Sequence, residues 1–155
     1  MFWNRWRNGV AKPTKIAVDA TAMISFLLGG KAISVFDSPD VDSFITTEFN
    51  IEEVQHMIPK LSEAYRFSRD HLLETLEKLK RTKLKVLGRS DYHAQWKKAY
   101  EIMSPIDEKD TDLLALALTF GCPVWTQDSD FQEPSVKKVI AAYSTGPLLK
   151  ILYGR

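Results

Sequence analysis

Acidic residues occupy the positions in this chain at which an α/β protein places its chemistry. Asp19 follows the apolar run at residues 15–18, Asp128 and Asp130 follow the apolar segment at 123–126, and Asp110 opens the apolar run at 110–120. In α/β proteins the carboxyl ends of the strands form the ligand-binding edge. Carboxylates gathered at that edge, with no basic residue between Asp110 and Asp130, require a cation. This pattern predicts a metal site and phosphate chemistry, although Asp is also a favoured helix N-cap and any one of these residues alone would fit that role.

The elements that must position these acids alternate between strand-like and helix-like patterns. Alternation of this kind predicts a three-layer α/β/α sandwich with a mainly parallel, about five-stranded sheet. A chain of 155 residues suits one domain with a sizeable core, so we expect a single domain over residues 1–155 with a basic N-terminal extension at 1–14. The expected strands are 15–19, 43–46, 84–87, 123–126 and 137–142, and the expected helices are 20–28, 48–65, 69–82, 91–103, 110–120 and 145–153.

A third acidic region lies where the predicted strand at 43–46 enters the predicted helix at 48–65. Glu53 directly precedes Val54 and lies at the margin of the apolar stripe of this helix, so its side chain can reach the edge of the sheet. Glu48 falls in the first helical turn, where a negative charge favours the helix dipole, and capping is its simpler role. Glu52 is expected to face solvent.

Composition and motif content exclude several classes of function. The net charge is only +1, so any contact with nucleic acid must come from local patches. The single Cys122 excludes an internal disulfide and a cysteine-based zinc site, and we expect it to be buried and inert. The three histidines lack HExxH spacing, and the chain has neither a P-loop nor a GxGxxG motif. No apolar run approaches the length of a membrane span, and a cytoplasmic location without membrane contact fits best.

The order and spacing of these motifs resemble those of the PIN-domain ribonucleases, which include toxins of the VapC type. The segments that carry the resemblance are IAVDATAMISFLL near the start, EEV in the strand-led helix, and DTDLLALALTFGCPVWTQDSDF. The resemblance extends from about residue 15 to residue 153 and implies a parallel sheet between helices, with an acidic cluster that binds Mg²⁺ or Mn²⁺. Carried over by position, the implied catalytic and metal-binding residues are Asp19, Glu53, Asp110 and Asp128, with Asp130 assisting the metal and Thr126 ordering the site.

Two of these assignments have alternatives within the sequence. The acid on the helix could be Glu52 instead of Glu53, and the third acid could be Asp107 or Asp112 instead of Asp110. Asp112 lies about 200° around a helix from Asp110, so the two side chains cannot both point at one site.

The resulting hypothesis is a metal-dependent endoribonuclease that hydrolyses RNA phosphodiester bonds. Carboxylates suit Mg²⁺ or Mn²⁺, which activate water and relieve charge on the phosphate. By resemblance to the toxins, an antitoxin protein and a homodimer are the implied protein partners. The alternatives are a non-catalytic PIN-like module that binds RNA or protein, and a nuclease that acts on DNA or structured nucleic acid. Residues that could grip or stack on RNA are Lys80, Arg81, Lys83 and Lys85, the basic N-terminal residues, and Trp3, Trp6 and Trp96.

Overall fold

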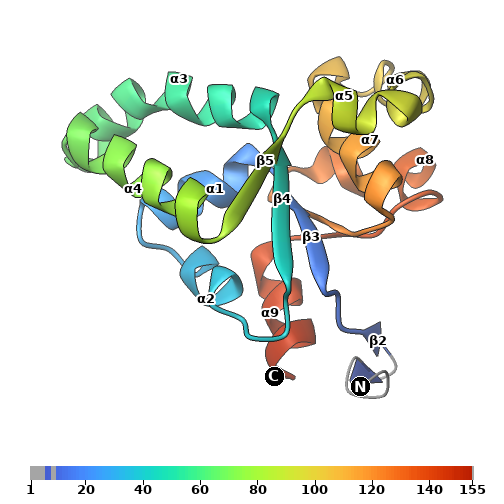
Figure 1. Cartoon of the computed structure of the whole chain (residues 1–155), viewed down its shortest axis with the longest axis horizontal. Helices are drawn as coiled ribbons and strands as arrows, with labels where there is room; N and C mark the ends of the chain where they lie inside the picture. The colour runs from blue at the N-terminus through green and yellow to red at the C-terminus, as the bar shows by residue number, and fades with distance from the viewer. Residues whose placement is uncertain (1–5, 8–9, 155) are drawn as a thin grey trace.

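A parallel sheet forms the middle layer of the molecule, with helices on both of its faces (Figure 1). The computed structural model describes residues 6–7 and 10–154. Within them, the five strands of this sheet all pair in parallel, in the order β5-β4-β3-β6-β7. This arrangement confirms the predicted three-layer α/β/α fold. The strands are β3 (Lys15–Val18), β4 (Ser43–Thr47), β5 (Leu84–Leu87), β6 (Val124–Trp125) and β7 (Ala142–Tyr143).

The helices divide into two layers. One layer packs on one face of the sheet and includes α1 (Ala20–Leu27), α2 (Ala32–Phe36), α3 (Glu48–Tyr65), α4 (Arg69–Thr82) and α9 (Thr145–Tyr153). The other layer contains α5 (Arg89–Tyr92), α6 (Trp96–Met103), α7 (Thr111–Phe120) and α8 (Pro134–Lys137). Figure 1 shows α3 and α4 lying side by side, away from α5, α6 and α7. Short 3₁₀ turns are η2 (His93–Gln95), η3 (Glu108–Asp110) and η4 (Ser129–Gln132).

Two hydrophobic cores fill the spaces between the layers, and the alternation of strand side chains explains why. Ile16 and Val18 of β3 point into the core beneath α1, α3 and α4, whereas Ala17 faces α7. Trp125 is fully buried in the first core and packs against Phe36, with ring centroids 4.9 Å apart. Each large apolar side chain buried in this way contributes roughly 2 kcal/mol to the stability of the fold. The strands that end at the acidic residues are therefore anchored on both faces.

Some predicted elements differ from the observed ones. The predicted strand at 137–142 is wrong, because Pro134 starts the short helix α8, and only the last residue of the predicted range belongs to β7. Proline is favoured at the first position of a helix, since its missing N–H would have no partner there. The predicted helix at 91–103 begins at Arg89 and is divided by η2 into α5 and α6. Cys122 is buried, as expected.

The strand order has a switch point at β3. The chain places β4 and β5 on one side of β3 and then crosses over to place β6 and β7 on its other side. At such a switch point the connections leave β3 and β6 in opposite directions, which opens a crevice where α/β proteins bind ligands. Asp19 comes directly after β3, and Thr126 comes directly after β6. The fold therefore places both residues at this switch point.

The N-terminal region forms a separate two-stranded sheet. Strand β1 (Trp6–Arg7) pairs antiparallel with β2 (Val10–Ala11). Trp3 and Arg5, which belong to the predicted basic extension, lie outside the described residues. Within the described part of the chain, no helix is both long enough and apolar enough to span a membrane.

Candidate active site

Asp19 is the buried centre of the acidic region. Its side chain is 5% exposed and caps helix α1, because Oδ1 accepts a hydrogen bond from the N–H of Ala20 at 2.6 Å. Oδ2 accepts hydrogen bonds from the hydroxyls of Thr21, at 3.1 Å, and Thr126. The Asp19 carboxylate therefore caps α1 and also belongs to the acidic region, and the hydrogen-bond donors around it fix its orientation.

Thr126 links Asp19 to the second acidic segment. Its hydroxyl donates to Asp19 and accepts a hydrogen bond from the N–H of Asp128 at 2.9 Å. The carboxylate of Asp128 in turn caps η4 by accepting from the N–H of Asp130 at 3.0 Å. This chain of hydrogen bonds places the loop after β6 against the end of β3.

Helix α3 brings Glu53 to the same edge through Asn50. The side-chain amide of Asn50 donates to Glu53 Oε1 at 3.1 Å and lies 3.5 Å from Asp19 Oδ1. Asn50 is itself buried and held by Thr47, whose hydroxyl donates to its Oδ1 at 2.6 Å. Glu53 is half-buried, whereas Glu52 is exposed. Of the two candidate glutamates, the structure therefore connects Glu53 to Asp19.

The carboxylates of Asp107, Asp110 and Asp130 form the tightest group. One oxygen from each lies within 4.8 Å of the others. The 3₁₀ turn η3 explains how Asp107 joins, because residues three apart in such a turn lie on one side. Asp107 accepts a hydrogen bond from the N–H of Lys109 at 3.0 Å, whereas the buried Oδ2 of Asp110 has no hydrogen-bond partner.

The pKa shifts show that the carboxylates of Asp107 and Asp110 lie close to those of Asp19, Glu53 and Asp128. Burial, followed by the charges of Asp19, Asp128 and Asp107 and by a hydrogen bond that the protonated Asp110 side chain makes with Asp130, raises the pKa of Asp110 to about 8. Burial also raises the pKa of Asp19 despite its hydrogen bonds, and the charge of Asp128 adds to this effect. For Glu53, burial and then the charge of Asp19 raise the pKa, while Asn50 and Lys109 oppose the change. Mutual repulsion and burial thus make this edge costly to ionise without a cation.

Asp112 points away from this region, as its position on the helix predicts. Its carboxylate accepts hydrogen bonds from the indole N–H of Trp96 at 2.8 Å and the hydroxyl of Tyr92 at 3.0 Å, and Arg89 lies 3.3 Å away. These donors tie α7 to α5 and α6, so Asp112 has a structural role. Trp96 stacks on Tyr100, with ring centroids 5.1 Å apart, and the Arg89 guanidinium lies over the Trp96 ring.

Of the residues predicted to contact RNA, Lys80, Arg81, Lys83 and Lys85 lie at the opposite edge of the sheet. Lys83 and Lys85 flank the start of β5 next to the start of β4, whereas the acids follow the carboxyl ends of the strands. Two of these cations have partners, because Lys80 pairs with Glu77 at 3.1 Å and Lys83 with Asp37 at 3.9 Å. We refer to Lys80, Arg81, Lys83 and Lys85 as the basic cluster. Its role in RNA binding stays a prediction.

Residues that sequence reasoning missed include Asn50 and Thr21. Asn50 stands three residues before Glu53, a spacing that places both on one face of a helix and could have indicated the contact. Thr21 donates to Asp19 and accepts from the N–H of Gln127 at 3.0 Å, so it joins the two loops. The sequence suggests Asp107 only as a substitute for Asp110, whereas the structure places the two together.

The acidic residues fit a hard divalent cation. Oxygen ligands lie at about 2.0–2.1 Å from Mg²⁺, so two ligands of one ion are at most about 4.2 Å apart. The oxygens of Asp107, Asp110 and Asp130 lie within 4.8 Å of one another, so a small movement of these side chains would bring them to one ion. The buried Asp110 Oδ2 without a partner is the kind of atom that a cation would satisfy.

Comparison with known structures supports the fold. PAE2754 from Pyrobaculum aerophilum superposes with a TM-score of 0.67 at 18% identity, covering 92% of this chain and 97% of that chain. VapBC2 from Rickettsia felis, solved bound to a DNA fragment from their promoter, gives a TM-score of 0.64 at 8% identity, and FitAcB from Neisseria gonorrhoeae gives 0.59 at 14%. Each of these two covers 84% of this chain and 98% of the other.

The sequence comparisons give the family. No curated protein matches the chain significantly. The model of the PIN domain matches residues 17–140, a range that contains every carboxylate of the acidic region. Because this match spans most of the sequence, the chain belongs to the PIN-domain family.

Proposed function

We propose that this protein is a Mg²⁺- or Mn²⁺-dependent endoribonuclease that hydrolyses phosphodiester bonds in RNA. The observation that carries the proposal is the group of carboxylates at the switch point, with the pKa of Asp110 raised to about 8 and its Oδ2 unpartnered. It costs free energy to ionise a cluster of carboxylates, and a bound cation offsets this cost by neutralising their charge. Membership of the PIN-domain family supports the same conclusion.

The acidic residues would serve the reaction by holding a divalent cation. Asp107, Asp110 and Asp130 would hold the ion, with Asp19, Glu53 and Asp128 beside them. When bound, such an ion neutralises charge on a phosphate and lowers the pKa of a water molecule.

The surrounding hydrogen bonds would fix the acids in place. Thr126 and Thr21 orient Asp19 through their hydroxyls, and Asn50 orients Glu53 through its amide. These donors would hold the carboxylates close together before the cation binds, which reduces the reorganisation that binding requires.

The partners of this function follow from the resemblance to VapC-type toxins. We propose that the protein is the toxin of a toxin–antitoxin pair, held inactive by an antitoxin protein and acting in the cytoplasm as a homodimer. If so, its expression alone should arrest the growth of a bacterial host, and the Asp19→Asn variant should not. Sedimentation of the purified protein would test the dimer directly.

The decisive experiment is cleavage of labelled single-stranded RNA with Mg²⁺ or Mn²⁺. We expect Asp19→Asn, Asp128→Asn and Glu53→Gln to lose at least about a hundredfold in rate while keeping the fold, because each loses charge but little volume. Glu52→Gln is the matched control, since Glu52 is exposed one residue from Glu53 and should leave cleavage unchanged.

Two results would contradict the proposal. If the wild-type protein binds RNA but cleaves no substrate with either metal, the protein is instead the non-catalytic RNA-binding module. If single-stranded DNA of the same sequence is cleaved as fast as RNA, the assignment to RNA is wrong.

A further inference from the structure

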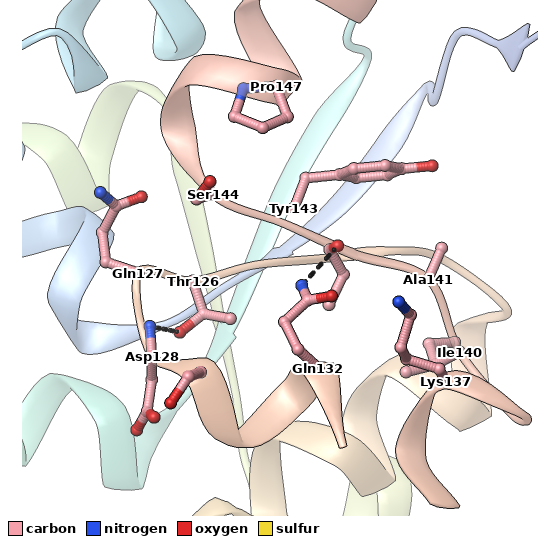
Figure 2. A pocket seen from close by; sticks show the side chains of 12 residues that line it. Thr126, Gln127, Asp128, Gln132, Lys137, Ile140, Ala141, Tyr143, Ser144 and Pro147 are labelled. Atoms are coloured by element: carbon pink, nitrogen blue, oxygen red, sulfur yellow. Dashed lines mark hydrogen bonds between the residues drawn. The ribbon is translucent and has the colours of Figure 1, made fainter. Parts of the chain in front are cut away.

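A cavity of about 700 Å³ opens beside the acidic region, between the loop after β6 and the segment that joins β7 to α9. Figure 2 shows the side chains that line it, with Thr126 and Asp128 at one side and Tyr143 and Lys137 further along. We propose that this cavity binds one nucleotide of single-stranded RNA, the one next to the phosphate that is cleaved. The proposal rests on the proposed ribonuclease function and identifies where its substrate lies.

The cavity is continuous with the acidic region through shared residues. Thr126 lines the cavity, and its hydroxyl also donates to Asp19. Asp128 lines it too, and its carboxylate accepts a hydrogen bond from the N–H of Asp130, one of the three acids that would hold the ion. A nucleic acid whose phosphate lies at the carboxylates must place its neighbouring nucleotides on the adjoining surface. On this side of the acids, that surface is the cavity.

The lining offers both parts of nucleotide recognition, a flat apolar surface and polar groups. Tyr143 lines the cavity and is only partly buried against the first core, so its ring is the aromatic group on which a base can stack, and Pro147 lines the cavity as well. A volume of about 700 Å³ lies within the range of small-molecule sites, which is roughly 300–1,000 Å³. Figure 2 shows Gln132 and Lys137 reaching from one wall towards the segment that carries Tyr143.

Two glutamine side chains that line the cavity are held by hydrogen bonds. The amide nitrogen of Gln132 donates to the carbonyl oxygen of Ala142 at 3.1 Å, which orients this side chain and leaves its Oε1 as an acceptor. Gln127 Oε1 accepts from both the N–H and the hydroxyl of Thr145, at 2.7 and 3.0 Å, which leaves its amide nitrogen as a donor. A polar acceptor held in this way, as the Gln132 Oε1 is, suits the polar edge of a base better than an apolar peptide side chain.

Lys137 supplies the charge that an RNA chain requires. It makes no salt bridge with any described residue, unlike Lys80 and Lys83 of the basic cluster. It is exposed and lies at the end of α8, across the cavity from the acids. This position suits contact with the phosphate on the far side of the bound nucleotide. Lys138, its exposed neighbour, does not line the cavity and provides a control of equal charge.

Cleavage kinetics test the proposal separately from the ribonuclease function. We expect Tyr143→Leu to raise KM for single-stranded RNA about tenfold with kcat little changed, because the base can no longer stack on the ring. Tyr143→Phe keeps the ring and should stay within about twofold of the wild type, with thermal melting to confirm that both variants fold. Lys137→Met should raise KM and lower the log–log salt slope by about 0.7, whereas Lys138→Met should change neither.

A direct binding measurement without metal completes the test. In NMR titrations of the wild-type protein with each of the four nucleoside 5′-monophosphates, the amides of residues 126–129 and 140–146 should shift. Inorganic phosphate should shift them much less. If RNA is cleaved but the Tyr143 and Lys137 variants behave like Lys138→Met, the nucleotide proposal is wrong and the ribonuclease function stands. Equal shifts with phosphate and nucleotides, or no shifts with any nucleotide, would also overturn it. Absence of cleavage in every variant, including the wild type, would instead overturn the proposed function.

Discussion

Asp110 should make the metal-free protein less stable as the pH rises, and the Asp110→Asn variant should lack this effect. The pKa of Asp110 is raised from 3.8 to about 8 because the side chain is partly buried beside Asp19, Asp128 and Asp107. The folded state therefore holds this proton more tightly than the unfolded state does. Its contribution to stability is complete below pH 3.8, decreases as the pH rises towards 8, and is absent above that value.

The size of the effect follows from the change in pKa. A rise from 3.8 to about 8 corresponds to about 6 kcal/mol, at about 1.4 kcal/mol for each pH unit. Asp110 is only partly buried, and solvent screens its charge, so we expect about 2 kcal/mol between pH 4 and pH 9. For a domain of this size, that free energy corresponds to a melting temperature about 4–8 °C higher for Asp110→Asn than for the wild type at pH 9.

Thermal melting in EDTA at pH 4, 6 and 9 measures this difference. The matched control is Asp112→Asn, two residues along, where Trp96, Tyr92 and Arg89 stabilise the charge and its removal should destabilise the protein. Mn²⁺ should raise the melting temperature of the wild type more than that of Asp110→Asn, because the ion binds the folded state through this carboxylate. A constant difference between Asp110→Asn and the wild type at all three pH values would refute the reasoning.

Three further perturbations test separate parts of the structure. Thr126→Val should lower the cleavage rate by about tenfold or more, because Asp19 and the N–H of Asp128 both lose their hydroxyl partner, and steady-state kinetics on single-stranded RNA would measure it. Neutralising the whole basic cluster should weaken RNA binding about equally for all sequences, with Mn²⁺ affinity unchanged. The slope of the logarithm of the RNA-binding constant against the logarithm of salt concentration should fall by roughly 0.7 for each phosphate that a lysine or arginine no longer neutralises. An unchanged slope would mean that the cluster is only solvated. Gly121→Ala should cost about 1 kcal/mol in urea unfolding, since Gly121 ends α7 at φ +61°, a conformation that strains residues with a Cβ.

The parts of the fold that the sequence predicts well are those whose signals are local and periodic. The predicted bounds of helix α4 match the observed ones, because its apolar spacing is regular and Ser68 caps its first turn. The strand predicted at 137–142 is wrong because apolar residues there reflect packing against the second core, which local alternation does not distinguish from a strand. Val136 is fully buried in the short helix α8, and Val139 packs against the same core outside any strand.

The candidate site shows the same division between local and long-range information. That Asp19 and Asp128 lie at strand ends could be read from the apolar runs before them, since strand ends in α/β proteins meet at one edge. The link through Thr126 could not be derived from local pattern, because it joins residues 107 positions apart in the sequence. The resemblance to PIN domains implied a role for Thr126, and the structure provides its contacts. Asp107 is only an alternative in the sequence because its placement depends on a short 3₁₀ turn that has no periodic signature.

The hydrogen bonds of the acids suggest why Asp110 differs from its neighbours. Asp19, Asp107 and Asp128 each accept a backbone N–H, which stabilises their charge and fixes their position at a helix or turn start. Asp110 directly precedes α7 and accepts no such bond, and no donor among the described residues reaches its buried Oδ2. The backbone N–H donors therefore hold the three capping acids in fixed positions, while Asp110 depends on an external cation to lose its proton near neutral pH. A site built in this way should bind its metal more tightly as the pH rises through about 8, with release of a proton from Asp110.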